Sequence, residues 1–316
     1  MKDFVAQQEN FVKRLIDVLK TKFTKELEFD YQMIIKTNDL CRPALIVREP
    51  KKEVGKTIYL EEAMKKHMVE GVDIDDLAED IVSFYETKSE FEELTALYLI
   101  EQMKNFEYLL DGHITLKLIN RSMNERFLQG KAYLEFLDLA IVFCMTLRDS
   151  DSGIGVIVIP KEFTRFWNIS LREAFKKVLN VLERNYPITR TTLFEFMLRQ
   201  IKNHSDELEE MHIHDFDVSK EMYIQTNQLN LNGSTTMLYR NNLAEFCEEK
   251  GIDEVYIIPS SIHEIILIPK FEEADEKYFK SIIREVNDTL LASDEILSNN
   301  LYIYNKNTDE ITICND

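Results

Sequence analysis

The sequence predicts an α+β fold, in which mixed, largely antiparallel sheets are flanked by helices and a long amphipathic helix begins the chain. Two observations lead to this prediction. Runs of β-branched and aromatic residues come in pairs that short turns separate, which is typical of antiparallel hairpins. Strand and helix patterns also follow one another without the regular alternation that a doubly wound parallel sheet requires.

The N-terminal residues carry a clear helical pattern. Apolar side chains recur at steps of three and four residues through residues 1–27, which predicts one amphipathic helix. The apolar positions are Phe4, Phe11, Val12, Leu15, Ile16, Leu19 and Phe23. Strands are expected at 31–37 and 44–48, followed by a helix near Glu61 that ends at Gly71.

A central hairpin is expected in the middle of the chain. The most apolar run, 137–147, is followed by a polar turn and by the apolar residues 153–159, so the two runs are expected to pair. Residues 161–203 have helical patterns that are interrupted near Trp167 and at Pro187.

The division into lobes is expected at an acidic segment. The sequence DELEEMHIHDFD at 206–217 is the strongest change of composition in the chain. A polar segment of this kind is typical of a linker. We therefore expect an N-terminal α+β lobe at 1–205 with the central hairpin, an acidic linker at 206–220 and a C-terminal α+β lobe at 221–316.

Turn and cap signals are dense in the C-terminal lobe. The expected elements are a strand at 221–226, an Asn232-Gly233 turn, a second strand, a helix that Asn241 or Asn242 caps and Gly251 ends, a hairpin of 255–258 with 262–268, a helix around Ile282, and a terminal hairpin of 301–304 with 310–314.

Composition limits the function. The net charge of −19 repels nucleic-acid phosphates and anionic membranes. A basic protein surface is therefore the expected partner, and no direct binding to nucleic acid or to a membrane is expected. The eight glycines form no dinucleotide-binding or Walker-type loop, and no cofactor is expected. No secretory signal or membrane span is recognisable, which makes the cytoplasm the expected compartment.

The four cysteines, Cys41, Cys144, Cys247 and Cys314, lie far apart in the sequence and form no Cys-x-x-Cys pair. Such spacing argues against a zinc site or a redox motif. Cys144 and Cys247 fall within apolar patterns and are expected to be buried thiols, with no disulfide.

Ser260, Ser261, His263 and Glu264 are the candidate catalytic residues. Because residues 262–268 are expected to form a strand of the hairpin, Ser261 and His263 are expected to project to one face and Glu264 to the other. A local Ser-His-acid relay is then excluded, and the Gly-x-Ser-x-Gly elbow that poses a nucleophilic serine is absent. The alternatives are a structural turn, or a hydrolase that takes its acid from elsewhere.

His212 and His214 are the candidate metal ligands, with Asp215 and Asp217 beside them. The His-x-His-x-Asp-His pattern of binuclear zinc hydrolases is not met, because Phe216 and Asp217 stand where its aspartate and third histidine belong. The segment is therefore either an exposed linker or an incomplete metal site.

An acidic cluster is expected on the helix that Asp73 caps. Asp75 and Glu79, like Asp76 and Asp80, are like-charge pairs four residues apart, and each pair costs about 0.2 to 0.5 kcal/mol. The cluster is either a solvated helix face or a surface that meets a basic partner.

Six segments carry a resemblance to a known family. They are 57–85 (TIYLEEAMKKHMVEGVDIDDLAEDIVSFY), 117–120 (KLIN), 136–142 (FLDLAIV), 229–239, 256–269 (YIIPSSIHEIILIP) and 301–304. Together they resemble a family of unknown function from anaerobic Firmicutes. The PSSIHE part is the most specific. The resemblance implies an intracellular bacterial or mobile-element protein and carries no activity with it.

Two hypotheses follow. The first is a non-catalytic intracellular binding protein whose acidic surfaces engage a basic protein, in one form an inhibitor whose carboxylates imitate nucleic-acid phosphates. The second is a hydrolase that uses His263 with Ser261, or a metal near His212 and His214. We favour the first, because no catalytic motif is complete whereas the charge is pronounced.

Overall fold

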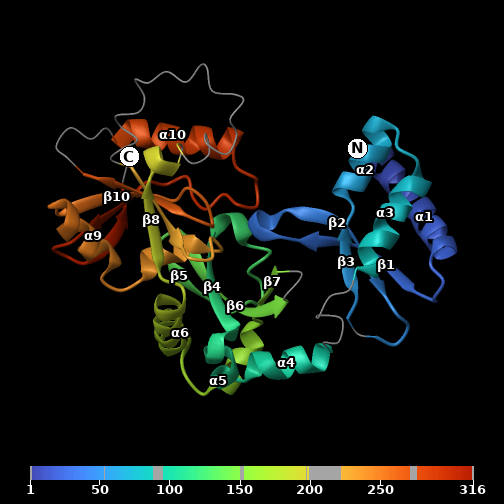
Figure 1. Cartoon of the computed structure of the whole chain (residues 1–316), viewed down its shortest axis with the longest axis horizontal. Coiled ribbons are helices and arrows are strands. Elements are labelled where there is room, and N and C mark those ends of the chain that lie inside the picture. The colour runs from blue at the N-terminus through green and yellow to red at the C-terminus, as the bar shows by residue number, and fades with distance from the viewer. Residues whose placement is uncertain are drawn as a thin grey trace.

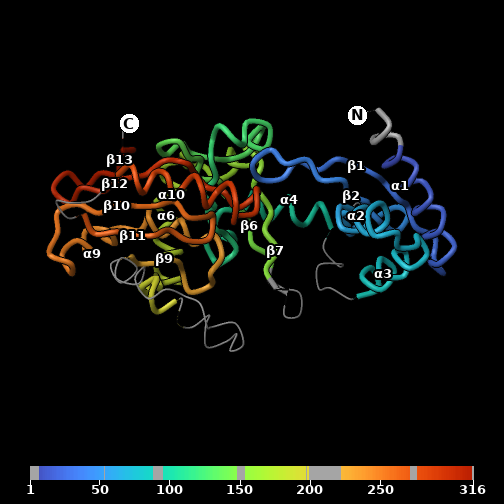
Figure 2. The backbone as a smooth tube through the Cα atoms, turned by 90° about the horizontal axis from the view of Figure 1, so that it is seen from above, coloured from blue at the N-terminus to red at the C-terminus, as the bar shows by residue number. Residues whose placement is uncertain are grey.

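The chain folds into two units that a long hairpin connects. The computed structural model describes residues 2–52, 54–87, 95–149, 153–196, 198, 222–270 and 276–314. In Figures 1 and 2 the N-terminal unit lies at one end of an elongated molecule and a larger unit at the other, with the hairpin of β1 and β2 reaching between them. The strands form three antiparallel sheets flanked by helices, which confirms the α+β class.

The N-terminal unit packs its helices against a small sheet. Its elements are α1 (Lys2–Lys22), β1 (Glu28–Ile35), η1 (Thr37–Asp39), β2 (Cys41–Arg48), β3 (Lys56–Tyr59), α2 (Glu61–Glu70) and α3 (Ile74–Glu86). The sheet has the order β1-β2-β3, and the helices bury their apolar faces in a core of their own. The expected N-terminal helix is confirmed with a shorter length, because it ends at Lys22. Gly71 ends α2 in the left-handed conformation (φ 74°), as expected.

The larger unit contains the remaining described residues. Its elements are α4 (Ala96–Lys104), α5 (Phe106–Tyr108), η3 (Leu109–His113), β4 (Ile114–Asn120), η4 (Ser122–Asn124), β5 (Tyr133–Phe136), β6 (Leu139–Asp149), β7 (Gly153–Val158), η5 (Lys161–Trp167), α6 (Leu171–Asn185), β8 (Ile188–Thr192), β9 (Tyr223–Asn227), η7 (Gly233–Leu238), α9 (Asn242–Lys250), β10 (Glu254–Ile258), β11 (Ile265–Pro269), α10 (Glu276–Thr289), β12 (Tyr302–Asn305) and β13 (Glu310–Ile313).

Both sheets of the larger unit contain expected hairpins. In the four-stranded sheet, β6 pairs with β4, β5 and β7, and the β6–β7 pairing confirms the central hairpin. The six-stranded sheet has the order β13-β12-β10-β11-β9-β8. The β10–β11 and β12–β13 hairpins are also confirmed, although β11 begins at Ile265 and not at Ile262.

The six-stranded sheet is covered on both faces. Val255, Ile257 and Leu267 face the main core, which also contains the four-stranded sheet and α6. Tyr256 and Ile268 face the other way, into a smaller core under α10. Because side chains alternate along a strand, apolar residues on both faces predict an interior strand, and β11 does lie between β10 and β9.

Three local predictions were wrong. Residues 188–192 were expected to be helical, but they form β8, because Pro187 ends the helix and the β-branched side chains that follow favour a strand. The strand expected after Gly233 is the 3₁₀ helix η7, in which Thr235 and Thr236 donate their hydroxyls to carbonyls three residues earlier. No side-chain bond caps α9, whose preceding residue Asn241 is left-handed.

The expected linker at 206–220 lies outside the described residues. Strand β8 precedes this segment and β9 follows it, and the two pair from Ile188 with Asn227 to Thr192 with Tyr223. Residues on both sides of the segment therefore contribute to one sheet.

The cysteine predictions are confirmed for Cys144 and Cys247, which are buried and free. Burial raises the pKa of the Cys144 thiol to about 12 and that of Cys247 to about 11, and thiolate is the reactive form.

We expect a disulfide exchange reagent such as 5,5′-dithiobis(2-nitrobenzoate) to label exposed Cys41 rapidly at pH 8, and to label Cys144 and Cys247 only after denaturation. A Cys41→Ser variant should lose the fast phase. Rapid native labelling of Cys144 would contradict the fold.

Candidate functional site

The loop between β10 and β11 holds the candidate catalytic residues. Ser261 is 3% exposed, and its hydroxyl donates a hydrogen bond to Glu264 Oε1 at 2.8 Å. The same hydroxyl oxygen accepts the His263 backbone N–H at 2.9 Å. The prediction that serine and glutamate point apart is wrong, because the segment is a loop and not a strand. These bonds close the loop on itself.

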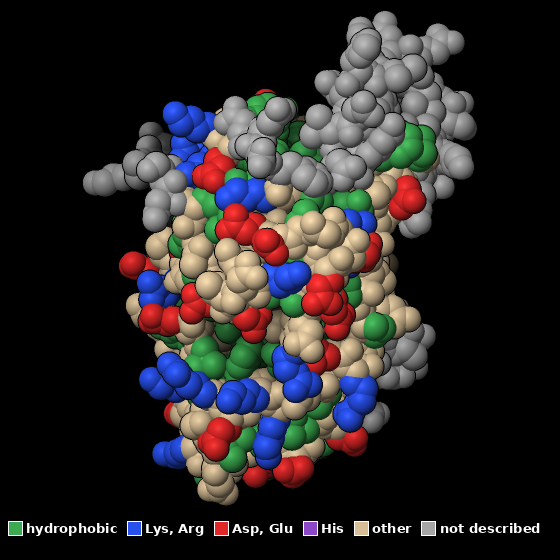
Figure 3. Space-filling model, turned by 90° about the vertical axis from the view of Figure 1, so that its left-hand side faces the viewer, with side chains coloured by type: hydrophobic (Ala, Val, Ile, Leu, Met, Phe, Trp, Pro, Cys, Tyr) green, Lys and Arg blue, Asp and Glu red, His purple; other side chains and the backbone are tan. Residues whose placement is uncertain are grey.

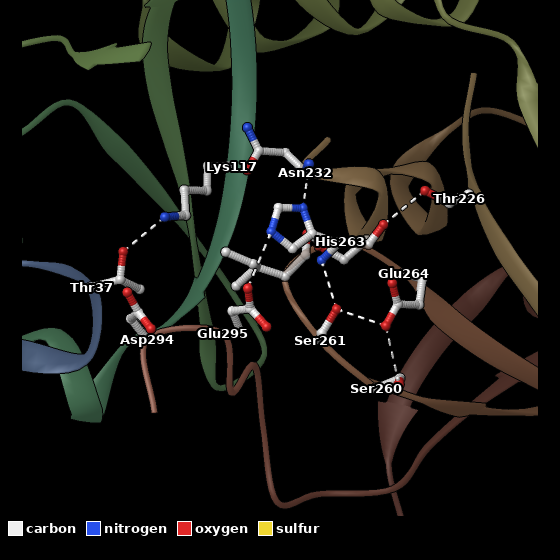
Figure 4. Close-up of polar contacts among 12 residues, drawn as sticks. Thr37, Lys117, Thr226, Asn232, Ser260, Ser261, His263, Glu264, Asp294 and Glu295 are labelled. Carbon is white, nitrogen blue, oxygen red and sulfur yellow. Dashed lines mark hydrogen bonds and ion pairs between the residues drawn. The ribbon is translucent and has the colours of Figure 1, made fainter. Parts of the chain in front are cut away.

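The His263 ring has other partners than Ser261. Its Nδ1 accepts the Asn232 backbone N–H at 3.3 Å, which places the proton of the neutral ring on Nε2. Nε2 faces Glu295 Oε1 at 4.0 Å. Figure 4 shows the ring between these two residues, with the serine hydroxyls on the far side of the backbone. The ring therefore does not form the hydrogen bond by which a histidine activates a serine.

On the side of the His263 ring away from the serines, Figure 4 shows a partly buried lysine contact. Lys117, on β4, donates to Thr37 Oγ1 at 2.7 Å, and Thr37 belongs to the tip of the β1–β2 hairpin. Burial lowers the pKa of Lys117. This contact joins the two units, and Lys117 carries no sequence motif that would have predicted it.

Asn38 anchors the tip of the same hairpin. Asn38 and Asn124 exchange two bonds: the Asn38 backbone N–H donates to Asn124 Oδ1 at 2.6 Å, and Asn124 Nδ2 donates to Asn38 Oδ1 at 2.7 Å. Asn38 Nδ2 also donates to the carbonyls of Ser293 (2.7 Å) and Ile296 (2.9 Å). Asn38 has φ 60°, a left-handed value that asparagine tolerates better than most residues. The tip is thus docked by complementary polar groups.

Asp138 connects the two sheets of the larger unit. Its carboxylate accepts hydrogen bonds from Ser298 Oγ (2.6 Å), Asn300 Nδ2 (3.0 Å) and Tyr302 Oη (2.7 Å). Burial raises the pKa of Tyr302, so the phenol stays a donor. A carboxylate with this many donors is well satisfied, which indicates a structural role.

The acidic cluster lies on the exposed face of α3. Asp73 caps the helix by accepting the Asp75 N–H at 2.9 Å, as expected. Asp75, Asp76, Glu79 and Asp80 are all exposed. Lys22 on α1 lies 3.5 Å from Asp75 and 2.9 Å from Glu79, so this row of the face is partly neutralised.

The second row of that face is more distinctive. Asp76, Asp80 and Phe84 follow one another at four-residue steps, so they lie on one side of α3. Phe84 is 56% exposed. Within the described part of the chain, neither Asp76 nor Asp80 makes an ion pair within 4 Å. The helix thus presents two carboxylates and an aromatic ring to solvent.

The candidate metal ligands His212 and His214 lie outside the described residues. Among the residues that the structure does describe, no group of three or more His, Cys, Asp or Glu side chains is arranged to hold a metal ion. None of the described helices has the length and apolarity to cross a membrane.

Comparison with known proteins identifies a family but no activity. The model of a family of unknown function matches residues 8–306, nearly the whole chain. No curated protein and no solved structure matches.

Proposed function

The chain belongs to this family of unknown function, DUF5688, and from its own geometry we propose that it is a non-catalytic protein that binds a basic protein partner. The observation that carries the proposal is the row of Asp76, Asp80 and Phe84 on the exposed side of α3. Exposed aromatic rings are frequent anchors of protein interfaces, and neighbouring charges steer the approach of a partner of opposite sign.

The net charge of −19 supports the same choice of partner. It favours the approach of basic proteins and opposes direct binding to nucleic acid. One form of the proposal is a cytoplasmic inhibitor, whose carboxylates occupy the phosphate site of a nucleic-acid-binding protein.

A hydrolase that uses His263 and Ser261 has less support. The Ser261 hydroxyl is engaged with Glu264, and Nδ1 of His263 accepts a backbone N–H. Activation of the serine would require both bonds to be exchanged, whereas a binding function requires no rearrangement of this loop.

The test is an affinity measurement with two variants. Asp76→Asn with Asp80→Asn should weaken binding about three- to tenfold at low salt and less at high salt, because salt screens exposed charges. Phe84→Ala should weaken binding at least about fivefold at both salt concentrations. The partner is captured from an extract of the cells that make the protein, identified, and titrated as a pure protein. Thermal stability of the charge variant should be equal or slightly higher, since a like-charge pair is removed.

A control removes two charges elsewhere. Glu285→Gln with Asp288→Asn changes exposed carboxylates on α10 and should leave the affinity unchanged. Glu79 is less suitable for the test, because its substitution also breaks the ion pair with Lys22. Equal losses in the α3 and α10 variants would show a general charge effect and reject this face as the binding site.

A further inference from the structure

A groove opens on the face of the larger unit that carries α6 and α9. Its volume is about 1000 Å³, and its walls come from β5, α6, the end of η7 and the β12–β13 hairpin. Leu134, Phe136, Phe175, Leu238 and Ile311 line it, and each is only partly buried. Figure 3 shows this face, with hydrophobic side chains in a hollow and a row of lysine and arginine side chains beside them.

The groove is basic although the whole chain is acidic. Its basic lining residues are Lys131, Lys161, Arg172, Lys176 and Arg240, and its acidic ones are Glu135 and Asp309. Glu135 already pairs with Arg121, which lies outside the lining. The positive charge of the groove is therefore locally in excess.

Most of the basic side chains are not neutralised. Arg240 pairs with Glu183 at 3.2 Å. The other four form no ion pair within 4 Å with any residue in the described ranges. Arg172 and Lys176 are four residues apart, so they lie on the same side of α6. Phe175, the residue before Lys176, also lines the groove.

We propose that this groove binds a small organic anion with an apolar body, of the class of medium-chain carboxylates. Sites for small molecules typically have volumes of about 300 to 1,000 Å³ and combine an apolar lining with a few polar groups. The partly exposed apolar lining matches the apolar body. Arg172 and Lys176 on α6 match the anionic head, because an arginine can bind a carboxylate through two parallel hydrogen bonds.

The test measures binding of dodecanoate to the full chain by calorimetry, below the concentration at which the ligand aggregates. Saturable binding of one equivalent is expected. Octanoate should bind more than about tenfold more weakly, since each methylene group that leaves water contributes to affinity. Dodecyltrimethylammonium has a chain of the same length with a cationic head and should bind at least about tenfold more weakly than dodecanoate.

Two double variants locate the site. Arg172→Gln with Lys176→Gln should weaken dodecanoate binding about tenfold, because both cations near the head are lost. Lys177→Gln with Arg184→Gln removes two exposed charges from α6 outside the groove lining and should bind as the wild type does.

Three results would overturn the proposal. They are the absence of saturable dodecanoate binding, equal binding of the cationic amphiphile, and unchanged binding in the Arg172 and Lys176 variant. An acidic amphipathic peptide that binds the wild type but not this variant, in the absence of dodecanoate binding, would assign the groove to a protein segment instead.

Discussion

Leu267→Ala is expected to lower the free energy of unfolding by about 2 to 5 kcal/mol, the range for deleting a fully buried leucine side chain. Leu267 is 0% exposed and lies in β11, between Ile257 of β10 and Tyr223 of β9. The substitution leaves a cavity where the leucine side chain was. The surrounding structure cannot collapse into it, because β11 is paired on both edges and covered on both faces. Denaturant unfolding measures the change.

The adjacent residue is a matched control. Ile266 belongs to the same strand but is only partly buried, at the edge of the core under α10. Ile266→Ala removes a side chain of similar size and should cost clearly less than Leu267→Ala. Equal losses at both positions, or a loss below about 1 kcal/mol at Leu267, would contradict the burial of this sheet.

Asn38→Ala is expected to weaken the docking of the two units by about 3 to 5 kcal/mol. The substitution removes three side-chain hydrogen bonds, each with a net contribution of about 0.5 to 1.5 kcal/mol. Alanine also tolerates φ 60° less well than asparagine, whose short polar side chain can hydrogen-bond locally, and this strain adds up to about 1 to 2 kcal/mol. The single tryptophan, Trp167, reports on the larger unit, and circular dichroism reports on both units. In the variant, the dichroism transition should begin at a lower denaturant concentration than the fluorescence transition.

Asn38→Gly separates the two contributions. Glycine tolerates the left-handed conformation but loses the same three hydrogen bonds. The loss of docking free energy in Asn38→Gly should therefore be smaller than that in Asn38→Ala, and the difference is the backbone strain. If the Asn38→Ala protein unfolds with coincident probes at the wild-type midpoint, the hairpin tip does not couple the units.

Local signals in the sequence predicted much of the fold. Gly71 and Gly251 end helices because glycine adopts the left-handed conformation without strain, and both are visible in a single sequence. The hairpins could be predicted because the paired strands are adjacent along the chain. The pairing of β8 with β9 could not, since partners separated by an intervening segment leave no local trace.

The candidate site was harder to predict. The contact of Ser261 with Glu264 depends on a loop, and the alternation of side chains that holds in a strand does not apply there. Lys117 looks like an ordinary strand residue, and only its contact with Thr37, which is 80 positions earlier, shows that it joins the two units. The turn residues Asn38 and Asp39 between two strand patterns were the available signal for the hairpin tip.

The docked hairpin also fixes a distance. Each of its strands has eight residues, which corresponds to a length of about 26 Å at about 3.3 Å per residue. The tip is held by Asn124 on one side and by the carbonyls of Ser293 and Ile296 on another, so it resists both sliding and rotation. The docked hairpin would therefore hold a protein bound to α3 and an anion bound in the groove at a fixed distance from each other.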